Sequence, residues 1–317
     1  MSRNVLLSGL RFVMLGLNEM TNDLNGDQSA LETFARYRGL LFSVAYRMLG
    51  SVADAEDMLQ ETFIRWQRAA GEDIESPRAF LVTIISRLCI NHLQSARVQR
   101  EEYVGEWLPE PLVTDMSSDP YETLKIDESI SMAFLLLLER LNPIERAVFL
   151  LHEVFSYKFA EIAATVDRTE ANCRQILKRA REHVGEARPR FEATESDRDE
   201  MLRGFLQATQ TGDMKGLLEL LANDVVLHTD GGGKALALPA VVHGQDDVTR
   251  VIMRSMANLV PKDLELRTMR INGEAGFVSY LGGKPFSAIT LQVGEEQIRA
   301  IYIVTNPEKL LHLIAFR

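Results

Sequence analysis

The sequence predicts a multidomain protein in which two all-α domains precede a C-terminal α+β domain. Apolar residues recur at helical spacing from residue 31 to about residue 103, with no alternating strand pattern. A second helical group over residues 128–190 ends in a helix–turn–helix pattern. From residue 196 onward, helical stretches give way to short strand-like runs between glycine-rich or polar turns.

The composition is that of an ordinary globular protein, with 46% hydrophobic and 25% charged residues among 317. The net charge of −10 argues against a wholly nucleic-acid-binding chain, although local charge decides in a multidomain protein. Cys89 and Cys173 lie in helical runs and are expected to be buried thiols in a reducing cytoplasm. We therefore expect a cytoplasmic protein with no disulfide, no metal and no cofactor.

Residues 1–29 form an N-terminal extension ahead of the first domain. Their short apolar centre faintly resembles a signal peptide, but no small-residue cleavage site follows it. No run in the chain approaches the roughly 18 apolar residues of a membrane span. No membrane partner is expected.

The first domain, residues 30–103, is predicted to contain three helices. Ser51 is a plausible N-cap for the second helix, whose polar face carries Asp54, Asp57 and Glu61. An acidic face of this kind suits a basic partner, although it is equally typical of a solvated helix. Ser76 and Pro77 open a third helix, because proline fits the first helical position. One stripe of that helix is polar: Arg87, Asn91, Gln94 and Ser95.

Residues 104–127 are predicted to be a linker. Three prolines and five acidic side chains favour an extended, solvated tether over a packed element. Within it lies WLPEP, residues 107–111, and a tryptophan in a linker usually docks on another surface.

The second all-α domain, residues 128–190, has a helix break at Asn142-Pro143 and a helix–turn–helix after it. Thr169 is expected to cap the second helix of this motif. A recognition helix presents polar and basic residues from its N-terminal half to the major groove of DNA. The residues that can do so are Arg168, Glu170, Asn172, Arg174, Gln175, Lys178 and Arg179.

The C-terminal domain, residues 196–317, is predicted to combine two or three helices with mostly antiparallel strands. The strand-like runs cover residues 225–229, 264–271, 276–281, 286–293, 298–304 and 311–316. Two short motifs stand out: DGGGK at 230–234 and NPEKL at 306–310. Three successive glycines allow positive φ and a close approach of another surface, although a flexible turn is the common explanation.

Residues 30 to about 190 resemble the sigma-70 superfamily of transcription initiation factors. DAEDMLQETFIRW, residues 54–66, resembles the region 2 helix that docks on RNA polymerase, and LERLNPIERAVFLLHEVF, residues 138–155, resembles the start of region 4. The resemblance implies core RNA polymerase (β′ clamp helices and β flap) and promoter DNA as partners. The polymerase-binding residues that it implies are Asp54, Asp57, Gln60, Glu61 and Trp66.

The same resemblance assigns DNA-reading roles to the two polar helix faces. The third helix of the first domain would melt the −10 element through Arg87, Asn91, Gln94 and Ser95, where unstacked bases expose their edges. The recognition helix would read the −35 element from the major groove. Each of these two regions alone would bind DNA weakly, and promoter specificity would need both elements held at a fixed spacing by the polymerase. Small basic patches on an otherwise acidic protein are therefore sufficient for DNA binding.

The C-terminal domain resembles the SnoaL-like, NTF2-like cone that is fused to one subgroup of extracytoplasmic-function sigma factors. That subgroup carries WLPEP, DGGGK and NPDKL; here Glu308 replaces the usual aspartate. The resemblance implies regulation in cis, without a separate anti-sigma factor. The expected regulatory interface comprises Trp107, Leu108, Pro109, Glu110, Pro111, Asp230, Gly231, Gly232, Gly233, Lys234, Asn306, Pro307, Glu308, Lys309 and Leu310.

Other functions stay open at this point. NTF2-like folds also host isomerases and cyclases, which would need a general base such as His228, Asp230 or His243. A small-molecule sensor in the apolar cone is a further alternative. A helix–turn–helix repressor is another, although it would leave the acidic helix and the −10 helix without a role. We expect a regulatory domain and no enzyme.

Overall fold

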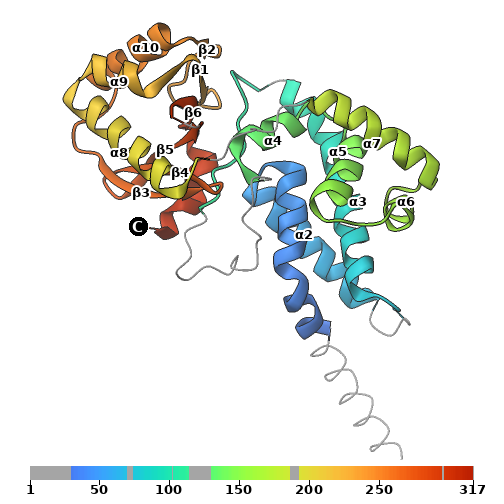
Figure 1. Ribbon diagram of the computed structural model, residues 1–317. Helices are drawn as coiled ribbons and strands as arrows, with labels where there is room; N and C mark the ends of the chain where they lie inside the picture. Colours follow the sequence, from blue (N-terminus) through green and yellow to red (C-terminus); the bar gives the residue numbers. More distant parts are fainter. Residues whose placement is uncertain are drawn as a thin grey trace, which may run out of the picture.

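The computed structural model describes residues 30–69, 74–101, 103–113, 130–185, 193–294 and 296–316; for residues 96–101, 315 and 316 it describes the backbone alone. Figure 1 shows a helical body beside a C-terminal α+β body, with α4 lying between them. No helix among the described residues is long and apolar enough to cross a membrane.

The first helical domain contains a helix over residues 30–49, α2 (Val52–Arg68) and α3 (Pro77–Glu101). The predicted cap is confirmed, because the Ser51 hydroxyl accepts the backbone N–H of Asp54. Helix α3 begins at Pro77, as the Ser-Pro signal predicts.

The second helical domain contains α4 (Met132–Leu138), α5 (Pro143–Phe149), the π-helix η2 (Leu150–Val154), α6 (Phe159–Val166) and α7 (Glu170–Val184). Asn142 lies at the predicted helix break and forms a capping box with Glu145, while Thr169 caps α7 as predicted. A single hydrophobic core runs through both helical domains. It includes Phe42 and Ile85 of the first domain together with Leu138, Phe149 and Cys173 of the second. The two domains are therefore packed as one body.

The C-terminal domain is a six-stranded mixed sheet with helices on one face. Its elements are α8 (Glu195–Thr211), α9 (Met214–Leu220), β1 (Leu221–Asp230), β2 (Val242–His243), α10 (Gln245–Asn258), β3 (Glu265–Ile271), β4 (Glu274–Leu281), β5 (Lys284–Val293), β6 (Ile298–Val304) and the 3-10 helix η3 (Pro307–Phe316). The strand order is β2-β1-β6-β5-β4-β3, and β1 runs parallel to β6 while the other pairs are antiparallel.

Two expectations for this domain are corrected. The apolar run at residues 311–316 is part of η3 and not a strand. The run follows an Asn-Pro turn, and its Leu313 packs on the face of the sheet that is not covered by α8, α9 and α10. The sequence pattern also missed β2, whose two residues are too few for any periodicity.

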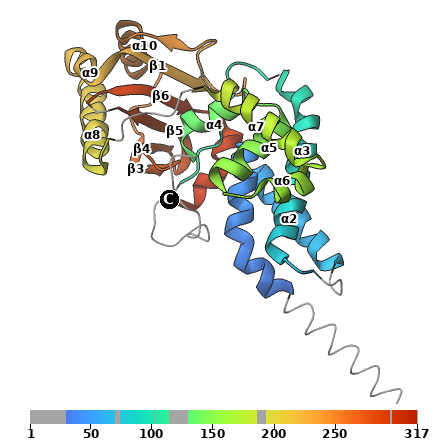
Figure 2. The same cartoon turned by 45° about the vertical axis from the view of Figure 1, so that its right-hand side comes forward.

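The sheet separates two apolar clusters. Leu227, Phe277 and Ile301 pack with α8, α9 and α10 on one face. Val278 and Tyr302 pack on the other face with Leu108 of the linker and with α4 and η3. Figure 2 shows α8, α9 and α10 on the far side of the sheet from the helical body. The opposite face is thus the one that meets the rest of the chain.

Candidate functional site

The WLPEP segment lies between the first helical domain and the C-terminal domain. Leu108, Pro109, Glu110 and Pro111 are all buried. The expectation of a solvated tether is therefore wrong for residues 108–113, because both neighbouring domains cover the extended chain. Residues 114–127 of the predicted linker lie outside the described residues.

On the side of the C-terminal domain, the centre of the contact is the carboxylate of Asp230, which is fully buried at the end of β1. Its Oδ2 accepts the backbone N–H of Leu108 at 2.8 Å and lies 2.7 Å from Nζ of Lys309. Its Oδ1 accepts the hydroxyl of Tyr103 at 2.6 Å and the N–H of Gly232 at 2.9 Å. Four donors therefore satisfy one buried charge.

Lys309 completes this arrangement from η3. Its ammonium group also donates to the carbonyl of Leu108 and lies over the ring of Trp107, 4.3 Å from the ring centroid. Burial, followed by the hydrogen bond to Asp230, raises the pKa of the Tyr103 hydroxyl, so this group stays protonated as a donor. We call the contacts among Tyr103, Trp107, Leu108, Asp230 and Lys309 the linker lock.

DGGGK and NPEKL lie against one another beside the linker lock. Lys234 pairs with Glu308, and the amide of Asn306 donates to the hydroxyl of Tyr103 at 2.9 Å. Gly232 has φ 58°, and a Cβ there would overlap the amide of Asn306. Glycine is required here because Asn306 approaches the backbone closely. The triplet is therefore more than a flexible turn at this position.

The remaining motif residues differ in exposure. Gly231 and Leu310 are buried, whereas Gly233 and Pro307 are exposed. A Cβ at Gly231 would overlap the carbonyl of Ala235, and one at Gly233 would press on Val104. The whole predicted regulatory set is thus gathered at one interface.

On the side of the first helical domain, Glu110 reaches the N-terminus of α2. Its carboxylate accepts the Ser51 hydroxyl at 2.9 Å and the N–H of Val52 at 2.7 Å. A carboxylate is stabilised there by the unpaired N–H groups and by the helix dipole. The neighbouring Trp107 covers Gly50, where a Cβ would lie 2.6 Å from the indole ring. WLPEP therefore joins two domains through one buried carboxylate on each side.

Asn272 is a contact that the sequence analysis did not identify. It is buried in the β3–β4 turn, with φ 54°. Its amide donates to the hydroxyl of Tyr46 at 2.6 Å and to the carbonyl of Ile130 at 2.8 Å, and its oxygen accepts the N–H of Leu112 at 3.0 Å. One side chain thus links both helical domains and the linker. The Asn-Gly pair signals a turn, but no pattern indicates where its side chain reaches.

Two histidines extend the interface. His312 of η3 lies 2.6 Å from the carbonyl of Pro111, and burial lowers the pKa of this histidine. His228 lies 2.7 Å from Glu106 and stacks on Tyr302. Sequence reasoning could find neither contact with the linker, because the two partners lie 201 and 122 positions away.

The predicted polymerase-binding residues divide into two groups. Asp57 and Gln60 are exposed on α2, and Asp54 and Glu61 are half-buried beside them. Trp66 is a correction: it is buried in the core, packs on Phe80 and donates its indole N–H to a backbone carbonyl. Its spacing places it on the apolar side of the helix, so it offers no surface to a partner.

The polar stripe of α3, which was predicted to contact the −10 element, is covered by α6 at one end and exposed along the rest. Asn91, Gln94 and Ser95 are exposed. Arg87, however, donates to the carbonyls of Ala164 and Thr165 in α6, at 2.8 and 2.9 Å. Thr83 and Thr165 also lie with their hydroxyl oxygens 3.1 Å apart. The helix–turn–helix domain therefore covers one end of this stripe.

The recognition helix α7 is open by contrast. Arg168, Glu170, Arg174, Gln175, Lys178 and Arg179 are exposed, and Asn172 is half-buried in the first turn. The pair between Glu170 and Arg174 is internal to the helix, at 2.8 Å. This face is free to meet a major groove.

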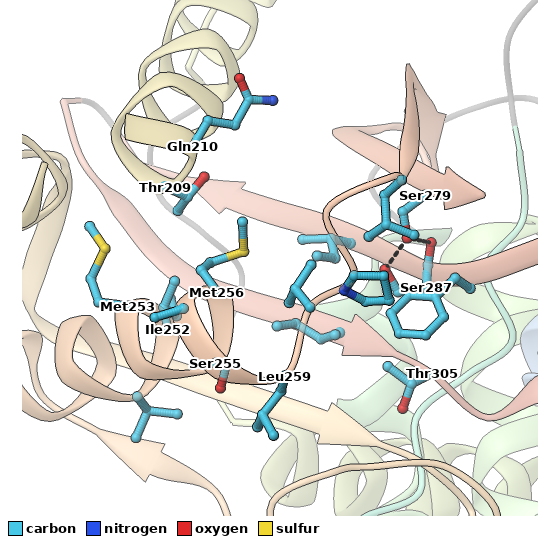
Figure 3. A pocket seen from close by; sticks show the side chains of 18 of the residues that line it. Thr209, Gln210, Ile252, Met253, Ser255, Met256, Leu259, Ser279, Ser287 and Thr305 are labelled. Carbon is cyan, nitrogen blue, oxygen red and sulfur yellow. Dashed lines mark hydrogen bonds between the residues drawn. The ribbon is translucent and has the colours of Figure 1, made fainter. Parts of the chain in front are cut away.

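The face of the C-terminal sheet that is turned away from the linker holds a cavity of about 790 Å³ beneath α8 and α10 (Figure 3). Leu227 and Thr229 line it, so the alternation of β1 turns His228 and Asp230 toward the linker instead. His243 does not line the cavity either. The three residues considered as a general base are therefore not in the pocket.

Comparison with known proteins agrees with this architecture. Residues 33–98 match the family model of sigma-70 region 2, and residues 131–184 match that of sigma-70 region 4. The ECF RNA polymerase sigma factor SigJ of Mycobacterium tuberculosis is 36% identical over 291 residues, covering 87% of this chain and 91% of SigJ. The probable ECF sigma factor SigI of the same organism is 31% identical over 276 residues, covering 86% and 92%.

A crystal structure of M. tuberculosis SigJ superposes with a TM-score of 0.73 at 33% identity, covering 88% of this chain and 97% of that one. The fold and these matches define a sigma factor, the class of protein that directs transcription initiation. The chain belongs to the extracytoplasmic-function (ECF) sigma factors, and it carries a C-terminal α+β domain beyond the two sigma regions.

Proposed function

We propose that this sigma factor is controlled in cis by its NTF2-like domain, and that the linker lock holds it in a closed form. The observation that carries the proposal is the buried ion pair between Asp230 and Lys309, closed around the backbone of Leu108. A buried pair with all its hydrogen bonds made is costly to disrupt on one side alone. Because the lock is intramolecular, even a modest contact stays populated.

In the closed form, the two DNA-reading surfaces are not equally available. Arg87 on the proposed −10 surface is engaged by α6, while the proposed −35 surface on α7 is exposed. Binding both promoter elements would require α6 to leave α3. We infer that core RNA polymerase separates the two helical domains. The C-terminal domain, which the lock holds on the linker, opposes the separation because its Asn272 is bonded to both helical domains.

The partner surfaces follow from exposure and charge. The acidic face of α2, with Asp57 and Gln60 exposed, would meet the basic clamp helices of the polymerase, and the region 4 domain would meet the flap. With the lock built into the chain, no separate anti-sigma factor is required. The role proposed for the C-terminal domain is regulatory, since no Asp, Glu or His is among the residues that line its cavity.

The test is transcription in vitro from a candidate promoter with core RNA polymerase and the full chain. Lys309→Met should raise initiation severalfold, because it leaves Asp230 buried without its cation. Lys215→Met is the matched control, since Lys215 forms an exposed pair with Glu219. Equal initiation by the wild type and a folded Lys309→Met chain would remove the lock from the regulation of this protein.

A further inference from the structure

The cavity on the helix-covered face of the C-terminal sheet has the size and lining of a small-molecule site. Its volume of about 790 Å³ falls within the range of about 300–1,000 Å³ that is typical of ligand pockets. Ile252, Met253 and Met256 of α10 line it from one side, and Thr209 and Gln210 of α8 from another (Figure 3). Several elements of the domain therefore contribute to the lining, with apolar side chains from α10 and polar ones from the end of α8.

The polar groups of the cavity are few and almost all uncharged. Ser279 and Ser287 share a hydrogen bond of 2.6 Å on neighbouring strands, and Ser255 and Thr305 add hydroxyl groups. Among its lining residues, only Lys262 carries a charge. Lys262 is exposed to solvent, so a charged ligand inside the cavity would lack a buried compensating partner. The lining suits a neutral, mostly apolar molecule that carries hydroxyl or carbonyl groups.

The cavity and the interface with the linker meet at the end of β1 and in the two residues that follow β6. Thr229 and Thr305 line the cavity, and each directly precedes a residue of the interface, Asp230 and Asn306 respectively. The backbone N–H of Thr305 also donates to the carbonyl of Asp230 at 2.8 Å. Because successive side chains of β1 point to opposite faces of the sheet, a shift of the end of β1, or of the residues at 305 and 306 that are hydrogen-bonded to it, would be felt at both sites.

We propose that this cavity binds a neutral apolar ligand with hydroxyl or carbonyl groups, and that the bound ligand stabilises the linker lock. The sign follows from the structure, in which the formed cavity and the formed lock occur together. By thermodynamic reciprocity, opening the lock must lower the affinity for the ligand by the same factor by which the ligand stabilises the lock. The consequence for transcription rests on the function proposed above, whereas binding and coupling do not.

The first experiment titrates the full chain with Nile red, a neutral apolar dye, and follows its fluorescence. Ser255→Phe should fill the cavity and weaken binding at least tenfold. Arg254→Phe is the matched control, because Arg254 is exposed on the same helix, and it should leave the Kd within twofold. If S255F does not fold, Met256→Trp takes its place. Equal affinity in the wild type and a folded cavity-filling variant would overturn the site.

The second experiment measures the coupling. Lys309 does not line the cavity, yet in the Lys309→Met variant the Kd for Nile red should rise about tenfold, within the 5–150-fold range of typical couplings. The sequence has two tryptophans, so in a Trp66→Phe chain the tryptophan fluorescence comes from Trp107 alone. If Nile red stabilises the lock, acrylamide should quench this fluorescence more slowly when the dye is bound. An unchanged Kd in a folded Lys309→Met chain would overturn the coupling. Neither measurement involves polymerase, so failure here is distinct from failure of the proposed function.

Discussion

Asp230 and Glu110 are both buried carboxylates beside WLPEP, but they are neutralised in different ways. Asp230 faces the linker from the C-terminal domain and has a full cation, Lys309, at 2.7 Å. Glu110 faces the first helical domain from the linker and is held by the Ser51 hydroxyl and by N–H groups at the start of α2. The ion pair cannot lose one partner cheaply, whereas the helix cap can lose its charge and keep its hydrogen bonds. The difference indicates that a single substitution on the C-terminal side disrupts the closed form more than one on the side of the first helical domain.

The largest effect is expected from Lys309→Met. Removal of one partner from a buried pair costs about 3–5 kcal/mol, so this change should destabilise the closed form by that order. Chemical denaturation and acrylamide quenching of Trp107 in the Trp66→Phe chain would measure it. The double variant Asp230→Asn, Lys309→Met should recover part of the loss, because no charge is left unpaired. A single variant as stable as the wild type would contradict the comparison.

Glu110→Gln should have a smaller effect. The amide oxygen can still accept hydrogen bonds at the N-terminus of α2, but the negative charge is lost, which costs about 0.5–2 kcal/mol for a cap. Denaturation of the full chain would measure it, with Glu219→Gln on the surface as the control. A loss larger than that of Lys309→Met would reverse the ranking of the two sides.

Arg87→Met should weaken the contact between α3 and α6 by about 1 kcal/mol, since the two hydrogen bonds are partly exposed to solvent. The same change should reduce use of the promoter, because Arg87 is also assigned to the −10 element. Promoter opening and the stability of the closed form must therefore both decrease. An increase in transcription would show that Arg87 acts in the closed contact alone.

The smallest effect concerns pH. Burial lowers the pKa of His312, so the folded chain binds less proton than the unfolded chain. Stability should be retained above the usual histidine value of about 6.5 and fall as the pH drops below it. His312→Asn removes the titrating group, and comparison of thermal melts at about pH 7.5 and 5.5 should show a smaller pH difference in this variant. An equal difference would assign the pH dependence to other groups.

Local signals predicted much of the fold. Ser51, Pro77, Asn142 and Thr169 set helix starts as expected, because caps and N1 prolines act through nearby backbone groups. The prediction of a strand at residues 311–316 was wrong, because a short apolar segment does not distinguish a strand from a helical turn. Trp66 shares the buried side of α2 with Leu59 and Thr62, as its helical spacing from them explains, whereas the family resemblance suggested a role in polymerase binding.

The site was predictable only in part. WLPEP, DGGGK and NPEKL were identified through resemblance to a family, and the structure places them together. Asn272 and Tyr46 lie 226 positions apart, and no local pattern records such a contact. Burial of the linker was missed for the same reason, because its proline and acid content describes the chain alone and not the surfaces that cover it.

Disulfide trapping between α3 and α6 would show whether the lock keeps these two helices together. The hydroxyl oxygens of Thr83 and Thr165 are 3.1 Å apart, so a Thr83→Cys, Thr165→Cys chain should form a disulfide in the closed form. We predict rapid trapping in this chain, slower trapping when Lys309→Met is added, and loss of transcription that reductant restores. The single Thr83→Cys chain controls for the native Cys89 and Cys173. Full transcription by the trapped chain, or trapping indifferent to Lys309, would contradict a lock that holds the two helical domains together.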